Sequence, residues 1–146
     1  MKIALRAREP ADDELHFAWQ AHPAQVATTV PARSRPDFDA WIARITADPT
    51  VTLRTITADG AVVGTINTFV VEGERYIGYR VANERWGKGI ATEAIRQMVE
   101  LDAARPIYAT VLASNVASVK ALQRNGFVSA REQMSGDGPE VVLRLG

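Results

Sequence analysis

The chain contains no cysteine, which excludes disulfides, thiolate metal sites and a cysteine nucleophile. Lysine is scarce, occurring only as Lys2, Lys88 and Lys120, and basic and acidic side chains number 17 each. A formal net charge of zero argues against a nucleic-acid partner and against a polybasic membrane anchor. The two histidines, His16 and His22, lack a third ligand nearby. We therefore expect no metal site and place both histidines on the surface.

Long apolar runs are also missing. No stretch approaches the roughly 20 apolar residues that a membrane-spanning helix needs, so we expect no membrane partner. The apolar run near the N-terminus is too short for a signal peptide and turns acidic at once. With the lack of cysteine, this favours a cytoplasmic location. The length and the hydrophobic fraction of 47% suit one globular domain, residues 1–146.

The first half of the chain predicts a strand, two helices and three antiparallel strands. Helix 37–47 carries Phe38, Trp41, Ile42 and Ile45 at spacings of three and four, which predicts a core face to which Trp19 also contributes. Dipeptides 59–60 and 72–73 are turn signals, position 64 is a candidate bulge, and segment 22–31 reads as a loop. The expected strands are 2–7, 51–57, 61–71 and 75–81, and the expected helices are 12–19 and 37–47.

The second half predicts alternating helices and strands. We expect a helix at 87–104, a strand at 107–112, and a helix that Ser114 or Asn115 caps and Gly126 ends. Val116, Val119 and Leu122 should face inward from that last helix. A hairpin of strands 127–131 and 140–145 should follow. The order predicts a mixed α/β sheet with one strand–helix–strand unit near its middle.

The segment around Gly87 and Gly89 joins an expected strand to an expected helix. A helix start leaves about four backbone N–H groups without intrahelical partners, and the peptide dipoles place partial positive charge there. Glycine removes the Cβ atom that would keep an anion from this backbone, and Arg85 and Lys88 add charge. The turn therefore indicates a phosphate or pyrophosphate site, although two glycines also occur where only a tight turn is needed.

The spacing narrows the choice of ligand. The segment lacks the G-x-x-x-x-G-K-[ST] pattern of a P-loop. A dinucleotide fold needs a third glycine, where this chain has Thr92, and an acidic residue at the end of the next strand, where it reads Leu112-Ala113-Ser114. The residues alone thus indicate an anionic, pyrophosphate-bearing ligand rather than a typical nicotinamide or ATP site.

Four runs stand in a distinctive order: Tyr79-Arg80-Val81, then the eleven residues from Glu84 to Ala94, then Asn115-Val116-Ala117-Ser118, then Asn125-Gly126-Phe127. In this order and at this separation they resemble the GNAT superfamily of acyl-CoA-dependent N-acetyltransferases. The branch that they resemble most closely includes the ribosomal-protein N-terminal-alanine acetyltransferases. The order of the expected elements is similar to that family over nearly the whole chain.

The resemblance implies a GNAT-type fold: a mixed, mostly antiparallel sheet of about six or seven strands, with a parallel splayed pair in the middle and about four helices. It implies direct transfer of an acetyl group from acetyl-CoA to a primary amine of a small molecule or a peptide N-terminus. The glycine turn would wrap the CoA pyrophosphate, and the strand before it would pair with the pantetheine amides. The implied cofactor-binding residues are Tyr79, Arg80, Val81, Arg85, Trp86, Gly87, Lys88, Gly89, Ile90, Ala91, Thr92, Asn115 and Ser118.

The chain departs from the family pattern where catalytic groups are expected. Glu84 stands where the family often has Gln or Arg, and Leu122 stands where many members have a tyrosine general acid. The strand before Tyr79 carries no obvious carboxylate base. The remaining catalytic candidates are Ser118, as a donor to the departing sulfur, Tyr79 and Glu93. Each has a structural alternative: a polar helix face, a core position and a favourable place at a helix start, respectively.

Two other functions stay open. The fold could be a CoA-binding regulatory domain with weak or no catalysis, or an unrelated phosphate-binding domain. The acceptor has no readable code, although Arg33 and Arg35, with no acid between Gln20 and Arg35, favour a neutral or carboxylate-bearing amine over a polyamine. The terminal strands could pair in a homodimer.

Overall fold

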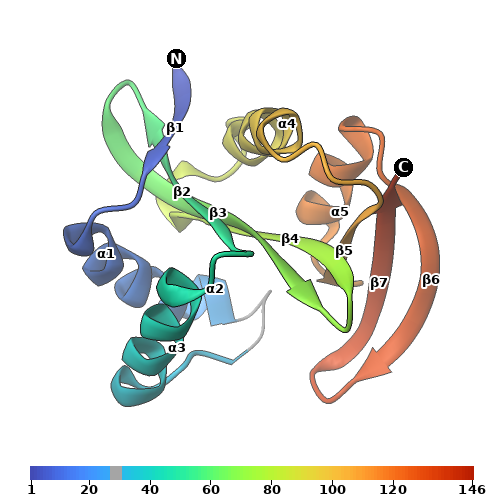
Figure 1. The fold of residues 1–146 in the computed structure, drawn as a ribbon, viewed down its shortest axis with the longest axis horizontal. Helices are drawn as coiled ribbons and strands as arrows, with labels where there is room; N and C mark the ends of the chain where they lie inside the picture. Colours follow the sequence, from blue (N-terminus) through green and yellow to red (C-terminus); the bar gives the residue numbers. More distant parts are fainter. Residues whose placement is uncertain (27–30) are drawn as a thin grey trace.

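The computed structural model describes residues 1–26 and 31–146, and these form one seven-stranded sheet. Its strands are β1 (Ile3–Ala7), β2 (Thr52–Ala58), β3 (Ala61–Val71), β4 (Glu74–Val81), β5 (Ile107–Leu112), β6 (Val128–Ser135) and β7 (Gly138–Leu145). Their order in the sheet is β1-β2-β3-β4-β5-β7-β6 (Figure 1). All neighbours are antiparallel except β4 and β5, which confirms the mixed sheet with a central parallel pair.

The helices lie on both sides of this sheet. In Figure 1, α1, α2 and α3 lie on the opposite side of strands β2–β4 from α4. None of the helices in the described part of the chain is long and apolar enough to cross a membrane. The bounds are α1 (Pro10–Ala21), α2 (Pro23–Val26), α3 (Arg35–Ala47), a 3-10 turn η1 (Asn83–Arg85), α4 (Ile90–Leu101) and α5 (Val116–Arg124).

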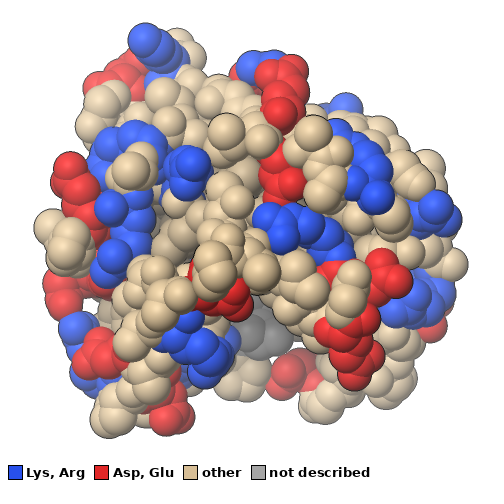
Figure 2. Space-filling view, viewed as in Figure 1, with Lys and Arg blue, Asp and Glu red and all other residues tan. Residues whose placement is uncertain are grey.

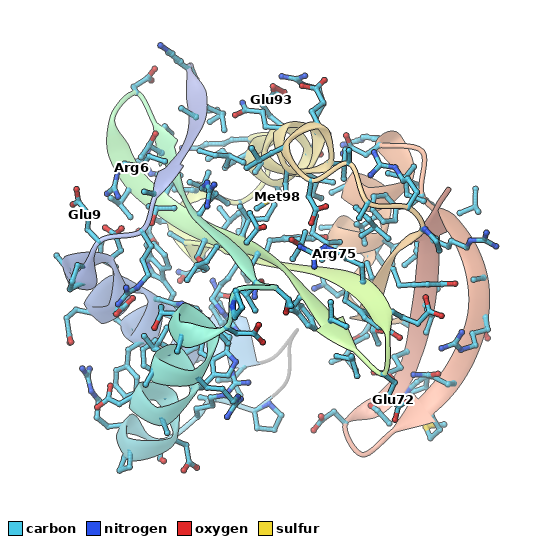
Figure 3. The ribbon with its side chains drawn as sticks, in the orientation of Figure 1. Arg6, Glu9, Glu72, Arg75, Glu93 and Met98 are labelled. Atoms are coloured by element: carbon cyan, nitrogen blue, oxygen red, sulfur yellow. The ribbon has the colours of Figure 1, made fainter. Side chains whose placement is uncertain are left out.

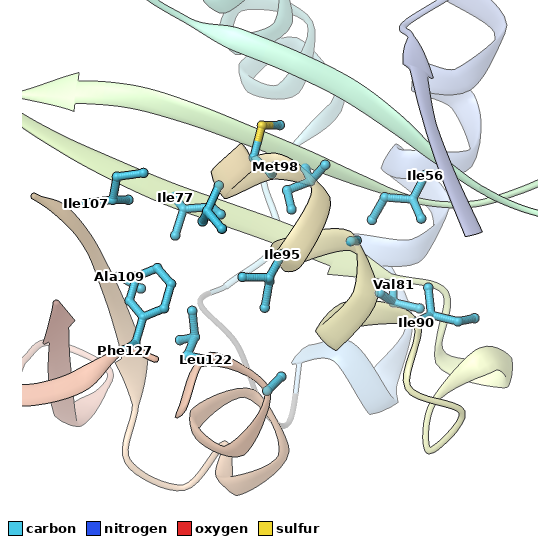
Figure 4. Close-up of a cluster of buried hydrophobic side chains, with 14 of the residues drawn as sticks. Ile56, Ile77, Val81, Ile90, Ile95, Met98, Ile107, Ala109, Leu122 and Phe127 are labelled. Atoms are coloured by element: carbon cyan, nitrogen blue, oxygen red, sulfur yellow. The ribbon is translucent and has the colours of Figure 1, made fainter. Parts of the chain in front are cut away.

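The main core fills the space between the sheet and helices α4 and α5 (Figure 4). Met98 and Ile95 of α4 and Leu122 of α5 are fully buried there, together with Phe127. A smaller cluster around Phe38 joins α3 to α1, as the apolar spacing of α3 predicts. Trp19 is buried and Trp41 is partly buried, so the aromatic core predicted for this half is confirmed.

The turn signals are confirmed. Asp59 and Gly60 have φ of +50° and +84°, and Glu72 and Gly73 have φ of +50° and +79°, the left-handed pairs that close two-residue hairpins. The predicted bulge is also present, because the β2–β3 register shifts at Ile56 and Thr57, opposite Gly64. A Cβ atom on Gly64 would lie 2.5 Å from the Arg80 carbonyl oxygen, so β3 and β4 approach more closely than a side chain permits.

The predicted helix 87–104 is wrong at both ends. Gly87 and Gly89 adopt φ of +77°, so the helix begins at Ile90, with its first backbone bond from the Glu93 N–H to the Gly89 carbonyl. It ends at Leu101 because Asp102 turns to an extended conformation, where its carboxylate accepts hydrogen bonds from Thr68 and Arg75.

Three other expectations need correction. Val116 is 54% exposed rather than inward, because the N-terminus of α5 borders an open groove. The final hairpin is longer at its tip than predicted, since β6 and β7 continue pairing to Ser135 and Gly138. Part of the expected loop 22–31 is the short helix α2, and positions 27–30 of that loop lie outside the described residues.

Charged side chains are mixed over the surface. Figure 2 shows Lys and Arg interspersed with Asp and Glu on the visible face, in keeping with 17 of each sign. Glu72 and Glu74 are exposed at their turn.

Candidate active site

The parallel pair β4–β5 is joined at only one end. Its ladder consists of Arg75 with Ile107 and Tyr76 with Tyr108, after which the strands separate. The remainder of β4 pairs only with β3, and the remainder of β5 only with β7. The two strands therefore splay into an opening in the middle of the sheet, as the resemblance to the GNAT superfamily implied.

A groove of about 580 Å³ extends from this opening between α4 and α5. It is lined by the end of β4, the glycine turn, the first turn of α4 and one face of α5. All of the predicted cofactor-binding residues lie along it except Lys88, which is exposed beside it. The structure thus brings together segments that are about 40 positions apart in the sequence.

The glycine turn presents bare backbone to the groove. A Cβ atom on Gly87 or Gly89 would meet no protein atom within 4 Å, so their left-handed φ, not crowding by the protein, requires glycine. The N–H groups of Ile90, Ala91 and Thr92 belong to the first turn of α4 and have no intrahelical acceptor. Converging donors at a helix start form an anion site.

Basic side chains reinforce that site. Arg85 from η1 and Lys120 and Arg124 from α5 line the same groove. Within residues 1–26 and 31–146, no carboxylate lies within ion-pair distance of any of the three. The groove therefore holds positive charge that the protein leaves uncompensated, as a polyanionic ligand requires.

The backbone of β4 is divided between two partners. The Ala82 N–H donates to the Val63 carbonyl at 2.8 Å, which fixes the ladder to β3. Because peptide groups alternate along a strand, the N–H and C=O of Tyr79 and Val81 point the other way, into the opening. The Val81 carbonyl there accepts hydrogen bonds from Gln25 at 2.8 Å and Trp86 at 3.0 Å. Trp86, at 43% exposed, thus joins the turn to β4 while lining the groove.

Tyr79 and Ser118 meet across the groove. The Tyr79 hydroxyl forms a short hydrogen bond with the Ser118 hydroxyl, joining β4 to α5. Burial raises the pKa of Tyr79 to about 12, against the opposing effect of the Ser118 bond. The phenol is therefore protonated at neutral pH. Leu122 occupies the α5 position where many GNAT members carry a tyrosine, and it is fully buried in the core. The Tyr79 phenol reaches the groove from β4, on the wall opposite α5.

Glu93 does not reach the groove. Its carboxylate accepts hydrogen bonds from Arg96, which lower its pKa, and it lies on the outer side of α4 while Met98 points to the sheet (Figure 3).

The predicted Asn115 cap is present, since its side chain accepts a bond from the Ser118 N–H at 3.3 Å, and Asn115 also lines the groove.

The α1–α3 side of the opening carries other residues, of which Arg80 and Gln25 also border the groove. Arg80 projects toward α2, where its guanidinium donates to the Gln25 side chain at 2.9 Å. His16 of α1, expected on the surface, is instead partly buried with its ring edge-on to Phe38 and Trp41. Burial, followed by the charges of Arg80 and Arg33, lowers the pKa of His16 to about 3. Such an imidazole is too weak a base to hold a proton at neutral pH.

Sequence reasoning missed several lining residues. Ala117, Lys120, Ala121 and Arg124 form one helical face with spacings of three and four, a signal that the sequence does contain. Nothing in the sequence marks Gln25 as a site residue, because Arg80 and Val81, which it contacts, are more than 50 positions away. In the part of the chain that the structure describes, no cluster of three or more His, Cys, Asp or Glu residues could hold a metal.

Comparison with protein-family models matches residues 2–128 to the acetyltransferase (GNAT) domain. The chain belongs to this family. The fold and the reaction class, an acetyl-CoA-dependent N-acetyltransferase acting on amines, are therefore confirmed at family level. No curated protein matches the sequence at a significant level.

Solved structures show the same fold at low identity. An aminoglycoside acetyltransferase, AAC(6')-Ib, in complex with coenzyme A is 21% identical, with a TM-score of 0.83 over 99% of this chain and 94% of that one. The Vibrio cholerae spermidine N-acetyltransferase with CoA and spermine is 16% identical, with a TM-score of 0.83 over 98% and 94%. Mycobacterium smegmatis RimJ with CoA-disulfide is 20% identical, with a TM-score of 0.80 over 98% and 81%.

Proposed function

We propose that this GNAT acetyltransferase binds acetyl-CoA in the groove between α4 and α5 and acetylates a primary amine that approaches through the β4–β5 opening. The observation that carries the proposal is the continuous groove from the splayed strands to the glycine turn. The groove fits the donor, because unpaired cations and bare N–H groups gather at one end and strand peptide groups face the other. The proposal treats residues 1–146 as one catalytic unit.

The residues divide the recognition of acetyl-CoA between them. Gly87, Gly89 and the first turn of α4 bind the pyrophosphate through N–H groups, and Arg85, Lys120 and Arg124 neutralise phosphate charge. The peptide groups of Tyr79 and Val81 that point into the opening hydrogen-bond the pantetheine arm. The N–H groups of Tyr79 and Val81 are the donors that can stabilise negative charge on the acetyl oxygen, because both point into the opening.

The transfer forms an N–C bond to the amine and breaks the C–S bond, so one proton leaves the amine and one is available to the departing thiolate. Tyr79 is protonated and bonded to Ser118, and we assign this pair as the donor to sulfur. The described residues that line the groove include no carboxylate. The ammonium proton therefore leaves through water, and kcat/KM should rise with pH up to the pKa of the acceptor amine.

The alternative is a CoA-binding domain without catalysis. Two absences favour it: the described groove residues include no carboxylate base, and α5 carries Leu122 instead of a tyrosine. An assay of amine-dependent thiol release from acetyl-CoA separates the two. We expect turnover in the wild type and a loss of about 10²-fold in kcat for Tyr79→Phe, with the KM for acetyl-CoA little changed. Tyr76→Phe, on the opposite face of the same strand, is the matched control. Acetyl-CoA binding without any thiol release would support the alternative.

The acceptor is a small amine or a peptide N-terminus, in line with the branch of ribosomal-protein N-terminal-alanine acetyltransferases to which we assign the chain. The support for this assignment is the motif order from Tyr79 to Phe127, and RimJ shares the fold. We further propose a cytoplasmic enzyme with no nucleic-acid or membrane partner. We also propose a homodimer through an edge strand, β1 or β6, which size-exclusion chromatography with light scattering tests directly.

A further inference from the structure

Two arginines, Arg33 and Arg80, lie on the α1–α3 side of the β4–β5 opening, where Arg80 and its partner Gln25 also border the groove. Tyr79 points to α5 and Arg80 to α2, because successive side chains of a strand project to opposite faces. Arg33, in the segment before α3, acts electrostatically on Arg80 and, like it, on His16. An amine that enters from this side meets these charges before it reaches the opening.

Neither arginine is neutralised by the protein. The partly buried Arg6, Arg8 and Arg75 each bond an aspartate, namely Asp12, Asp13 and Asp102. For Arg33 and Arg80, no carboxylate of residues 1–26 or 31–146 lies within ion-pair distance. Asp37 acts on Arg33 only at longer range. Arg80 is partly buried and Arg33 is exposed, and a partly buried, uncompensated guanidinium such as that of Arg80 favours an anionic ligand.

Both arginines are held in place. The buried Gln25 accepts from the Arg80 guanidinium and donates to the Val81 carbonyl. The buried Gln20 fixes the Arg33 backbone through bonds of 2.8 and 3.0 Å, and the Arg33 guanidinium lies 4.3 Å from the Trp41 ring centroid. Within residues 1–26 and 31–146, most donors of each guanidinium stay available, since each arginine has five N–H groups. The arrangement is thus preorganised for an anion rather than merely basic.

We propose that the acetyl acceptor carries a carboxylate besides its amine, and that Arg80, assisted by Arg33, binds this carboxylate on the α1–α3 face of the opening. Arg80 immediately precedes Val81, so a carboxylate bound there keeps the amine of a small molecule close to the reaction centre. The planar guanidinium matches a carboxylate with two parallel hydrogen bonds. This inference rests on the proposed function, because it needs acetyl transfer to occur at the opening.

The proposal separates this enzyme from two proteins with its fold. The Vibrio cholerae spermidine N-acetyltransferase has been solved with spermine, and AAC(6')-Ib has been solved with kanamycin. Both ligands carry several amines. A site with two uncompensated arginines repels such acceptors. The shared fold therefore does not imply a shared acceptor.

The test is a set of matched amines assayed with the purified enzyme and saturating acetyl-CoA. The set pairs each amino acid with its amide, pairs dipeptides with their C-terminal amides, and adds spermidine and kanamycin. We expect kcat/KM for at least one acid to exceed that of its amide, and of both polyamines, by about 10- to 100-fold. Free amino acids and dipeptides distinguish a metabolite from a peptide acceptor. A preference for amides or polyamines, or no turnover of any acid, overturns the proposal.

Variants show whether the arginine charge is responsible. Arg80→Gln should abolish the preference for the acid over its amide, and Arg33→Met should weaken that preference. Arg80→Lys should restore part of it, which a purely structural role would not predict. Arg131→Gln, on the exposed edge strand β6, is the control. A raised KM for acetyl-CoA in Arg80→Gln would assign Arg80 to the donor instead and overturn the proposal.

A thermal shift of the wild type by acetyl-CoA separates this proposal from the proposed function. If acetyl-CoA stabilises the protein and amides are acetylated as well as acids, only the carboxylate inference fails. If acetyl-CoA gives no stabilisation, the proposed function fails first.

Discussion

The two sides of the β4–β5 opening are built in different ways. The cofactor side consists largely of backbone: left-handed glycines, a helix start and strand peptide groups that point into the gap. The side that we propose for the acceptor consists of side chains from α1, α2, α3 and β4, such as Arg80 held by Gln25. A site built from backbone can bind the same ligand across a family, whereas a site built from side chains can change its ligand with a few substitutions.

The largest expected effect comes from Gly64, which lies beneath both sides. Gly64→Ala should destabilise the protein by about 3 kcal/mol, because its Cβ would lie 2.5 Å from the Arg80 carbonyl oxygen and the backbone must shift. Displacing the end of β4 should also lower kcat/KM for donor and acceptor by about 10²-fold. Denaturant unfolding and initial rates measure both.

Gly136→Ala is the matched control, since its Cβ would meet no atom within 4 Å and its φ is not left-handed. We expect its stability and rates to match those of the wild type. If Gly64→Ala behaves like this control, β4 is not held by the close approach, and the two sides are less coupled than we propose.

Asp12 offers a way to disturb the acceptor side alone. It joins α1 to the sheet, accepting bonds from Arg6 at 2.9 and 3.0 Å and from Thr55 at 2.7 Å. Asp12→Asn should cost about 2 kcal/mol and raise the KM of the acceptor, with acetyl-CoA binding unchanged. A matching loss of acetyl-CoA affinity would contradict the separation of the two sides.

The same carboxylate predicts acid sensitivity. Burial favours its neutral form, but the bonds from Arg6, the Glu9 N–H and Thr55, with the Arg6 charge, outweigh burial and lower the Asp12 pKa to about 2. Because the folded pKa is depressed, the stabilisation is complete above the unfolded value of 3.8 and is lost as pH falls toward 2. Unfolding free energies should drop by about 2 kcal/mol over that window, and Asp12→Asn should remove this component.

The smallest effect is expected at Glu93, which belongs to neither side. Glu93→Gln should change kcat/KM by less than about 3-fold, since its carboxylate bonds Arg96 on the outer side of α4. Initial rates across pH 6–9 provide the check. A drop of 10²-fold, or loss of a pH-dependent step, would make Glu93 a general base and contradict the water route.

The contrast between the sides also explains what the sequence could predict. Strand 107–112, the two left-handed hairpin turns and the Asn115 cap were predictable because each depends on neighbouring residues. The glycine turn was predictable for the same reason. The start of α4 was not, because glycine is compatible with both a turn and a helix until its φ is known.

The acceptor side could not be predicted in the same way. Gln25 contacts Val81 across 56 positions, and the pKa of His16 is lowered first by burial and then by the charges of Arg80 and Arg33, which come from two other segments. No local pattern encodes such contacts. In place of the missing α5 tyrosine, we propose Tyr79 and Ser118 as the proton donor. The periodicity of the sequence could not predict that these two side chains meet.

The most direct test of the central claim is thermal unfolding with and without acetyl-CoA, for the wild type and Gly89→Trp. Acetyl-CoA at ~100 times its dissociation constant should stabilise the wild type by about 2.7 kcal/mol, or about 8 °C. Gly89→Trp should fold with reduced stability, because the added Cβ meets no protein atom within 4 Å but the left-handed φ of +77° strains a non-glycine residue, and it should show no shift with acetyl-CoA. Equal shifts in both proteins, or none in the wild type, would contradict the assignment of the glycine turn as the CoA site.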